Sequence, residues 1–310
     1  MALQILTGDC RTILPTLPEQ SVHCCVTSPP YFGLRDYGCD GQIGLEKTPA
    51  EYVAEMVKVF REVRRVLRDD GTLWLNLGDS YVANGSNQVP QTKCHTGSGY
   101  AGPNRNGNTG LKPKNMLGIP WRVAFALQQD GWYLRSDIIW SKPNPMPESV
   151  TDRPTKAHEY IFLLSKSARY HYEADAIREK CTEESIARAA RNSFPNEQRA
   201  LSFPGQPSFR DRGEGTISLN ANGRNRRSVW TIPTQPYGGA HFAAFPEKLI
   251  EPCILAGCPE GGTVLDPFGG SGTTGRVAVE NRRSAILIEL NPEYVSLQRH
   301  RTSNIQINVF

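Results

Sequence analysis

Apolar residues follow two patterns along the chain, a helical spacing and short continuous runs. Between residues 51 and 71 they fall three or four positions apart, which is the stripe of an amphipathic helix that we expect to end at Gly71. Short, mainly apolar runs are typical of buried strands. We predict further helices over 120–131, 245–257 and 291–300, and one directly after the glycines at 269–275. We predict strands over 3–6, 22–27, 72–79, 132–140, 158–165, 262–266 and 285–289.

Strands that alternate with helices indicate an α/β fold, in which helices cover both faces of a mostly parallel sheet. The 310 residues are enough for one large domain of this kind or two small ones. No internal repeat is evident in the sequence.

Two stretches interrupt this alternation. We expect residues 83–116 to form a mobile loop, because glycine, asparagine, serine and proline make up 15 of the 28 residues from 83 to 110 and none is acidic. Residues 182–228 have little periodicity and are rich in arginine. From Ser185 to Trp230 eight arginines stand against three acidic residues, whereas the whole chain has a net charge of only +4. Such a segment is a candidate surface for nucleic acid, although a solvated basic surface has the same composition.

The composition indicates a soluble protein of a reducing compartment. Hydrophobic residues make up 38% and charged residues 21% of the chain, as in ordinary globular proteins. No apolar run reaches the ~20 residues of a membrane helix, and the first residues lack the basic region and cleavage pattern of a signal peptide. None of the eight cysteines forms a CxxC pair. We therefore expect a cytoplasmic protein with no membrane segment and no metal.

The segment VLDPFGGSGTTG, residues 264–275, leads from a predicted strand through glycines into a helix. Glycine lets a ligand approach the backbone closely, and the helix start offers amide groups. The segment is not a P-loop, because Arg276 and Val277 stand where the lysine and the hydroxyl would follow Gly275. A GxGxxG pattern is present from Gly270 to Gly275, but this pattern is common by chance.

Three side chains around these glycines favour one ligand. Asp266 offers a carboxylate to an ammonium group, and Phe268 suits a stacked purine. Glu289 ends the next strand, 23 residues after Asp266, where an acid can bind ribose hydroxyls. Ammonium, purine and ribose together describe S-adenosylmethionine better than NAD. A purely structural turn between strand and helix remains the alternative.

The run TSPPY, residues 27–31, ends a predicted strand in an unusual way. Two consecutive prolines cannot continue a strand, because proline lacks the amide hydrogen of a ladder and fixes φ near −65°. The turn therefore holds a small hydroxyl, a rigid carbonyl and an aromatic ring at the end of the strand.

TSPPY and DPFGGSGTT together resemble the catalytic and cofactor motifs of the DNA amino-methyltransferases, which methylate exocyclic nitrogens of cytosine or adenine. FPEKLIEPCI is similar to the helix before the cofactor motif, and LTGDC to the motif that supplies an acid beside the adenine. The catalytic motif precedes the variable region and the cofactor motif, as in the permuted group called β-class. The resemblance covers nearly the whole chain except 83–110 and 182–228.

This resemblance implies a Rossmann-like methyltransferase fold with a mostly parallel, seven-stranded sheet and a circularly permuted motif order. Residues 1–181 would form the catalytic part, 182–228 a target-recognition insertion, and 229–310 the cofactor-binding part of the same domain. The cofactor half then spans both termini, so we expect the strand 285–289 to lie beside residues 4–6.

The resemblance also implies a mechanism. An exocyclic amino nitrogen is a poor nucleophile because its lone pair is delocalised into the ring. Hydrogen bonds accepted from its two N–H groups favour a pyramidal nitrogen, whose lone pair can attack the methyl sulfonium. Ser28 Oγ and the Pro29 carbonyl are the expected acceptors, and Pro30 restricts the turn. Tyr31 would stack on a base flipped out of the duplex, and the transfer would be direct, with no covalent intermediate.

The identity of the base rests on Ser28. Adenine enzymes of the family mostly carry Asp or Asn at this position, so Ser28 favours N4 of cytosine, with N6 of adenine as the alternative. A protein glutamine-amide methyltransferase is a more distant alternative, because those enzymes carry Asn first and lack an arginine-rich insertion. A non-catalytic DNA-binding relative would show decay of the two motifs, and neither is decayed. Cys253 follows a proline, as the nucleophile of cytosine-C5 methyltransferases does, but it lies within a predicted helix and is expected to pack in the core.

The motifs give a set of expected site residues. The catalytic residues are Ser28, Pro29, Pro30 and Tyr31. The cofactor-binding residues are Asp9, Phe245, Asp266, Pro267, Phe268, Gly270, Ser271, Gly272, Thr273 and Glu289. The DNA-binding residues are Arg35, Lys142, Arg224, Arg226 and Arg227. Asp9 would also suit a helix cap, and Phe245 a core position.

The implied cofactor is S-adenosylmethionine and the implied partner is double-stranded DNA. The protein would be prokaryotic or phage-encoded and associated with the nucleoid. Two further partners are left as alternatives by the sequence. One is a second copy of the chain in a homodimer, and the other is a cognate restriction endonuclease that acts on the same site without forming a stable complex.

Overall fold

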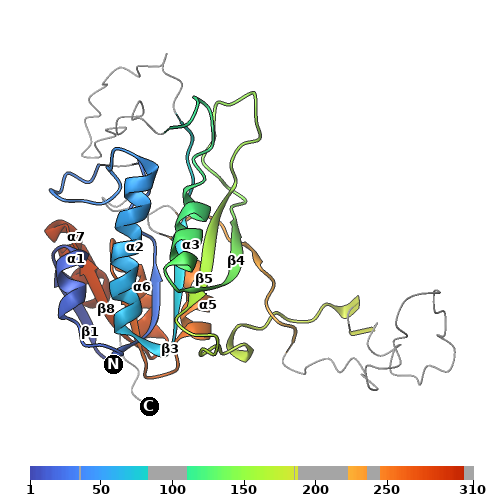
Figure 1. The fold of residues 1–310 in the computed structure, drawn as a ribbon. Coiled ribbons are helices and arrows are strands. Elements are labelled where there is room, and N and C mark those ends of the chain that lie inside the picture. The colour runs from blue at the N-terminus through green and yellow to red at the C-terminus, as the bar shows by residue number, and fades with distance from the viewer. Residues whose placement is uncertain (35, 83–109, 185, 188–222, 236–244, 304–310) are drawn as a thin grey trace, which may run out of the picture. The chain divides into compact units, whose positions relative to one another are not determined.

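The computed structural model describes residues 1–34, 36–82, 110–184, 186–187, 223–235 and 245–303 (Figure 1). The chain forms two compact units, one of Met1–Glu173 with Ser228–Phe310 and one of Ala174–Arg227. Most of the predicted loop 83–116 lies outside the described residues. Its last part is described, and there Lys114 and Asn115 exchange backbone hydrogen bonds with Val82.

The first unit contains one sheet, which has eight strands among the described residues. The strands are β1 (Leu3–Thr7), β2 (Val22–Thr27), β3 (Leu67–Leu77), β4 (Tyr133–Ser141), β5 (His158–Ser165), β6 (Val229–Thr231), β7 (Thr263–Asp266) and β8 (Ser284–Glu289). Their order in the sheet is β1-β8-β7-β2-β3-β5-β4-β6. Seven strands were predicted, and the additional strand is β6, whose three residues pair in parallel with β4.

Helices lie on both faces of this sheet. They are α1 (Cys10–Ile13), α2 (Pro49–Val66), α3 (Ile119–Gln129), α5 (Glu247–Gly257), α6 (Thr273–Glu280) and α7 (Pro292–Ser303), with the 3-10 turn η1 (Leu14–Thr16) after α1. Helices α2 and α3 pack together on one face, and α5 and α6 on the other (Figure 1). The predicted α/β fold with a mostly parallel sheet is confirmed. No helix in the described part of the chain is long and apolar enough to cross a bilayer.

The permuted arrangement is also confirmed, because the two ends of the chain meet in one half of the sheet. β1 pairs in parallel with β8, with Gln4 opposite Ile286 and Thr7 opposite Glu289. β7 pairs in parallel with β8 on one side and with β2 on the other. The carboxyl ends of β1, β8, β7 and β2 therefore lie along a single edge of the sheet.

Helix α2 begins as its sequence indicates but ends early. Thr48 and Glu51 form a reciprocal capping box at its start, at 3.1 and 3.0 Å. The helix was predicted to end at Gly71, but it ends at Val66 and the chain continues directly into β3. Leu67 is fully buried and lies opposite Val22 of β2, so strand pairing overrides the helical spacing there.

Cys253 was predicted to pack in the core, and this is confirmed. It lies within α5 and is buried. In the second unit, the described residues include the 3-10 turn η2 (Asp175–Ile177) and an antiparallel bridge between Glu179 and Arg224. Target recognition by the insertion 182–228, of which 188–222 lie outside the described residues, stays a prediction.

Candidate active site

A cavity of about 880 Å³ lies at the carboxyl ends of β2, β7 and β8. The chain leaves β2 toward its neighbour β3 and leaves β7 toward β8, on the opposite side. Open α/β sheets bind ligands in the crevice where the connections diverge in this way. Both predicted motifs contribute to the wall, through Ser28 and Tyr31 on one side and Asp266 on the other.

Asp266 ends β7 and is only 2% exposed. Its carboxylate accepts hydrogen bonds from Thr27 Oγ1 and Thr274 Oγ1, both at 2.6 Å, and from the Phe268 amide at 3.0 Å. Burial raises the pKa of Asp266 to about 6, although these hydrogen bonds oppose the shift. Thr27 directly precedes Ser28, so this carboxylate joins the two motifs.

The loop between β7 and α6 requires glycine at two positions. Gly270 and Gly272 have φ angles of 49° and 81°, in the left-handed region that favours glycine. A Cβ on Gly272 would also lie 3.0 Å from Cγ of Gln298. Ser271 and Thr273 line the cavity on either side of Gly272, at the amino end of α6, where helix amide groups are available to a ligand.

Glu289 ends β8 on the far side of this loop. Its carboxylate accepts hydrogen bonds from the amides of Gly270 at 2.7 Å and Asn291 at 2.8 Å. Burial raises the pKa of Glu289 to about 7. The cavity therefore has two buried carboxylates, Asp266 and Glu289, that ionise only as the pH approaches neutrality.

The TSPPY turn follows β2 directly. The Pro30 carbonyl accepts a hydrogen bond from the Tyr52 hydroxyl of α2 at 2.9 Å. The Pro29 carbonyl accepts none from the described residues. Ser28 and Pro29 both line the cavity. Of the two rigid carbonyls, the one that α2 leaves unengaged belongs to Pro29.

Tyr31 is the centre of a polar network below the turn. Its hydroxyl donates to Glu159 Oε2 at 2.7 Å, and Ser28 Oγ lies 3.4 Å from the same hydroxyl. Asn76 donates to Glu159 Oε2 at 3.2 Å, and Lys142 Nζ forms an ion pair with Oε1 of Glu159. Burial and the charge of Glu159 raise the pKa of Tyr31 well above its usual range, so its hydroxyl keeps its proton.

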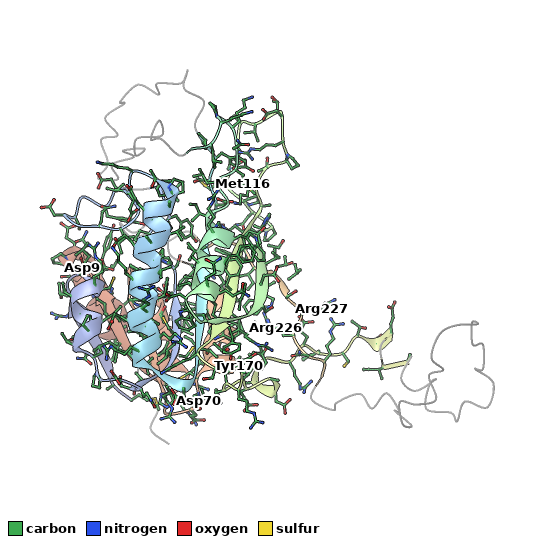
Figure 2. All side chains as sticks on the ribbon, viewed as in Figure 1. Asp9, Asp70, Met116, Tyr170, Arg226 and Arg227 are labelled. Atoms are coloured by element: carbon green, nitrogen blue, oxygen red, sulfur yellow. The ribbon has the colours of Figure 1, made fainter. Side chains whose placement is uncertain are left out.

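Asp9 lies in the cavity wall and at the start of α1 (Figure 2). It caps this helix by accepting from the Arg11 amide at 2.8 Å, and it pairs with the Arg11 guanidinium at 2.6 Å. Although partial burial opposes the shift, these bonds hold the pKa of Asp9 below its usual value. The capping alternative is present in the structure, and contact with a cofactor stays a prediction.

The structure brings most of the other predicted site residues together. Phe245, Pro267 and Phe268 line the same cavity, with Gly270, Ser271 and Thr273. Gly272 shapes the loop without lining the cavity.

The predicted DNA-binding residues are distributed differently. Arg35 lies outside the described residues. Lys142 is not an exposed surface cation, because it lines the cavity, pairs with Glu159 and lies over the Trp140 ring, with Nζ 4.2 Å from the ring centre. Within the second unit, Arg224 and Arg227 both pair with Glu179, at 3.1 and 3.2 Å. Arg226 lies between these two arginines in the sequence.

Sequence reasoning did not identify several residues of the site. Asn76 lies in the mainly apolar run 73–77 of β3, and Glu159 lies near the start of the mainly apolar β5. A polar residue in such a run is a signal that could have identified both. Gln298 and Arg301 of α7 hold the glycine loop from outside the cavity, donating to the carbonyls of Gly270 at 2.9 Å and Ser271 at 3.0 Å. These two lie in a largely polar helix, where nothing in the sequence sets them apart.

Comparison with known proteins agrees with this geometry. A family model described as a DNA methylase, for enzymes that act at N6 or N4, matches residues 22–299. The chain is 46% identical over 306 residues to the Type II methyltransferase M.Cfr9I of Citrobacter freundii, covering 98% of this chain and 89% of that protein. It is 46% identical over 300 residues to the Type II methyltransferase M.SmaI of Serratia marcescens, covering 96% and 90%.

Two solved structures share the fold. The Thermus thermophilus protein TTHA0409, complexed with S-adenosyl-L-methionine, superimposes with a TM-score of 0.59 at 26% identity and covers 99% of this chain and 97% of its own. The cytosine-N4-specific PvuII DNA methyltransferase gives a TM-score of 0.62 at 20% identity, covering 99% and 87%. At that identity the second likeness concerns the fold alone.

Proposed function

Because this chain belongs to the N6/N4 DNA methylase family, we propose that it methylates N4 of cytosine in duplex DNA. Family membership gives the reaction class, which is methylation of a DNA amino group with S-adenosylmethionine as the cofactor. The choice of cytosine rests on one observation, the serine at the first position of the SPPY motif. Adenine N6 is the alternative within the family.

The cavity fits S-adenosylmethionine in size and in chemistry. The carboxylates of Asp266 and Glu289 suit an ammonium group and ribose hydroxyls, and Phe245 and Phe268 offer aromatic faces for a purine. The bound cofactor supplies a methyl group activated by a sulfonium. We assign its binding to Asp9, Phe245, Asp266, Pro267, Phe268, Gly270, Ser271, Gly272, Thr273 and Glu289.

We assign the activation of the target amine to Ser28 Oγ and the Pro29 carbonyl, each accepting one of its N–H groups. The direction of the hydrogen bonds supports this assignment. The Tyr31 hydroxyl donates its hydrogen bond to Glu159, so the Tyr31 oxygen can accept a hydrogen bond from the Ser28 hydroxyl, at 3.4 Å. Ser28 lines the cavity, and its lone pairs then remain available to accept a hydrogen bond from the amine. Such bonds are often long before the substrate is bound and shorten in the complex.

The residues around the network have supporting roles in this proposal. Tyr52 holds the Pro30 carbonyl, which fixes the neighbouring Pro29 carbonyl in place. Lys142 pairs with Glu159 and offsets its charge. We assign target recognition to the insertion 182–228, with its arginines as contacts to DNA.

The product of the reaction tests the proposal directly. Unmethylated plasmid DNA is incubated with the protein and labelled S-adenosylmethionine and digested to nucleosides, which are separated and identified by mass spectrometry. We expect the label in N4-methylcytosine. The modified positions are then mapped by sequencing, which gives a short duplex that contains one target base.

The other outcomes separate the parts of the proposal. Label in N6-methyladenine alone would overturn the weight placed on Ser28 and keep the reaction class. Label in 5-methylcytosine would contradict the amine mechanism. No labelled nucleoside on DNA of varied sequence would contradict the proposed function.

A further inference from the structure

An apolar side chain is held out at the rim of the catalytic cavity. The turn after β4 reads KPNPMPE, residues 142–148, and its residues Lys142, Asn144, Met146, Pro147 and Glu148 line the cavity. Met146 is 84% exposed, the largest fraction among the exposed large apolar side chains of the described residues. A single exposed apolar residue is ordinary on a protein surface. Met146 differs from other exposed apolar residues in that it lines the cavity and lies in a turn held on both sides.

Polar contacts hold the turn on both sides of Met146. Asn144 and Thr234 are joined by three hydrogen bonds, from the Thr234 amide to Asn144 Oδ1 at 2.9 Å, from Asn144 Nδ2 to the Thr234 carbonyl at 3.2 Å, and from Thr234 Oγ1 to the Asn144 carbonyl at 3.3 Å. On the other side, Glu148 pairs with Arg153 at 2.6 Å. Prolines at 143, 145 and 147 restrict φ along the turn. The turn therefore presents Met146 from a rigid base.

In the proposed reaction, the DNA duplex offers an apolar space that an exposed side chain at the rim could fill. A base that enters the cavity leaves a gap in the base stack of the duplex, and opening that gap costs a few kcal/mol. The gap lies where the flipped nucleotide leaves the helix, at the rim of the cavity. Apolar side chains, methionine among them, insert between base pairs in other DNA complexes and replace lost stacking contacts. Methionine is unbranched and polarisable, so it adapts to a narrow apolar space.

We propose that Met146 inserts into the gap left by the target base and holds the duplex open. The proposal rests on the proposed function, since it needs a target base that leaves the duplex. The partner is the base stack at the methylation site, and the contribution of Met146 is limited to substrates in which the target base is paired. This restriction separates a wedge from a residue that acts on the cofactor or on the amine.

Met146→Ala is compared with the wild type on two forms of the mapped duplex. In one form the target base is correctly paired, and in the other it lies opposite a mismatched base. On the paired duplex we expect kcat/KM to fall by about tenfold or more, because the lost stacking amounts to a large part of the cost of opening the step. On the mismatched duplex the two proteins should differ by less than about twofold, because the mismatch already lowers that cost.

Two further variants serve as controls. Met146→Leu keeps an apolar wedge and should retain most of the activity on the paired duplex. Met116→Ala removes another exposed methionine of the same unit, labelled in Figure 2. Met116 is 53% exposed and is not among the residues that line the cavity, so this variant should be unchanged on both duplexes. Thermal unfolding of each variant checks that the fold is retained.

Equal activity of Met146→Ala and the wild type on the paired duplex would overturn the proposal, and so would an equal loss on both duplexes. A mapped adenine in place of a cytosine would overturn only the base assignment, because the same comparison of paired and mismatched targets then runs on adenine. A wild type that is inactive on paired DNA but active on the mismatched duplex would show that the protein does not open the helix, and would exclude the wedge.

Discussion

Asp266 and Glu289 are buried, although the cofactor-binding roles proposed for them require charge. Burial raises the pKa of Asp266 to about 6 and that of Glu289 to about 7, so both carboxyls bind protons over a range in which exposed acids are ionised. A ligand that donates hydrogen bonds or carries a positive charge binds their ionised forms. Removal of the protons is therefore part of the free energy of binding.

The affinity for S-adenosylmethionine should consequently depend on pH. Because binding requires the deprotonated carboxylates, affinity should rise by about tenfold or more between about pH 5.5 and 7.5, as the pH passes the pKa values of the two acids. Isothermal titration calorimetry at a series of pH values measures this. Glu289→Gln should weaken binding and lose the upper part of the profile, near pH 7. A flat profile in the wild type would contradict the assigned roles.

Ser28→Ala should separate cofactor binding from turnover. The substitution removes one hydrogen-bond acceptor for the amine, and a bond of this kind is worth about 1–2 kcal/mol, so kcat should fall by about fivefold to thirtyfold. The affinity for S-adenosylmethionine should be unchanged, because Asp266 keeps its bonds to Thr27 and Thr274. Ser21→Ala removes a hydroxyl that, within the described part of the chain, donates to the Pro18 carbonyl, and it serves as the control. Full activity in Ser28→Ala would exclude the acceptor role.

At the scale of elements, the turn from β7 into α6 has a left-handed backbone and lies at the cavity. Two glycines allow the effect of the backbone conformation to be measured apart from the effect on binding. Gly272 has φ 81° and lies in the loop, whereas Gly261 has φ 78°, precedes β7 and has no heavy atom within 4 Å of an added Cβ. Alanine at either position should lower the free energy of unfolding by about 1–2 kcal/mol, the cost of a left-handed conformation. Gly272→Ala should cost somewhat more, because its Cβ would also press on Gln298.

Only Gly272→Ala should weaken the binding of S-adenosylmethionine. Chemical denaturation gives the free energy of unfolding of each variant, and calorimetry gives the affinity. Equal affinities of Gly272→Ala and the wild type would mean that the loop conformation does not matter for the cofactor. Weakened binding in Gly261→Ala would indicate a general loss of order.

The elements that could be predicted are those whose local pattern agrees with their tertiary contacts. β2 and β5 have the predicted bounds, because apolar runs in a buried sheet leave little ambiguity. The end of α2 could not be predicted, because the helical spacing continues to Leu67 while pairing with Val22 pulls that residue into β3. α1 has only four residues and depends on its cap at Asp9.

Some residues of the site could also be predicted from the sequence, and others could not. The Ser28–Tyr31 turn and the glycine loop are contiguous in sequence and could be found by their motifs. The polar network joins Tyr31 to Asn76 and Glu159, which come from different strands, so their meeting depends on the antiparallel register of β3 and β5. Met146 becomes notable only through its exposure and its place at the cavity, which no sequence pattern contains.

At the scale of the whole molecule, positive charge is unevenly distributed. The segment from Ser185 to Trp230 has eight arginines and three acidic residues in a chain whose net charge is only +4. Within the second unit, Glu179 pairs with two of the arginines, Arg224 and Arg227. A phosphate that binds there must compete with this carboxylate, which lowers affinity without removing the salt dependence of binding.

Replacing Arg224, Arg226 and Arg227 by alanine should weaken DNA binding and make it less dependent on salt. Each phosphate contact contributes about 0.9 to the slope of log K against log salt concentration, so three lost contacts should reduce the slope by about 2 to 3. Fluorescence anisotropy with a labelled duplex over a series of salt concentrations measures both quantities.

A control that removes the same charge elsewhere is needed, because any loss of three arginines lowers the net charge. Arg61, Arg68 and Arg282 suit this purpose, since each is exposed in the first unit and pairs with an acidic side chain, as Arg224 and Arg227 do. Their replacement by alanine should leave the slope nearly unchanged. If both triple variants reduced the slope equally, binding would follow the total charge, and the arginines of the insertion would have no special place in contacting DNA. If only the control reduced it, the phosphate contacts that set the slope would lie in the first unit.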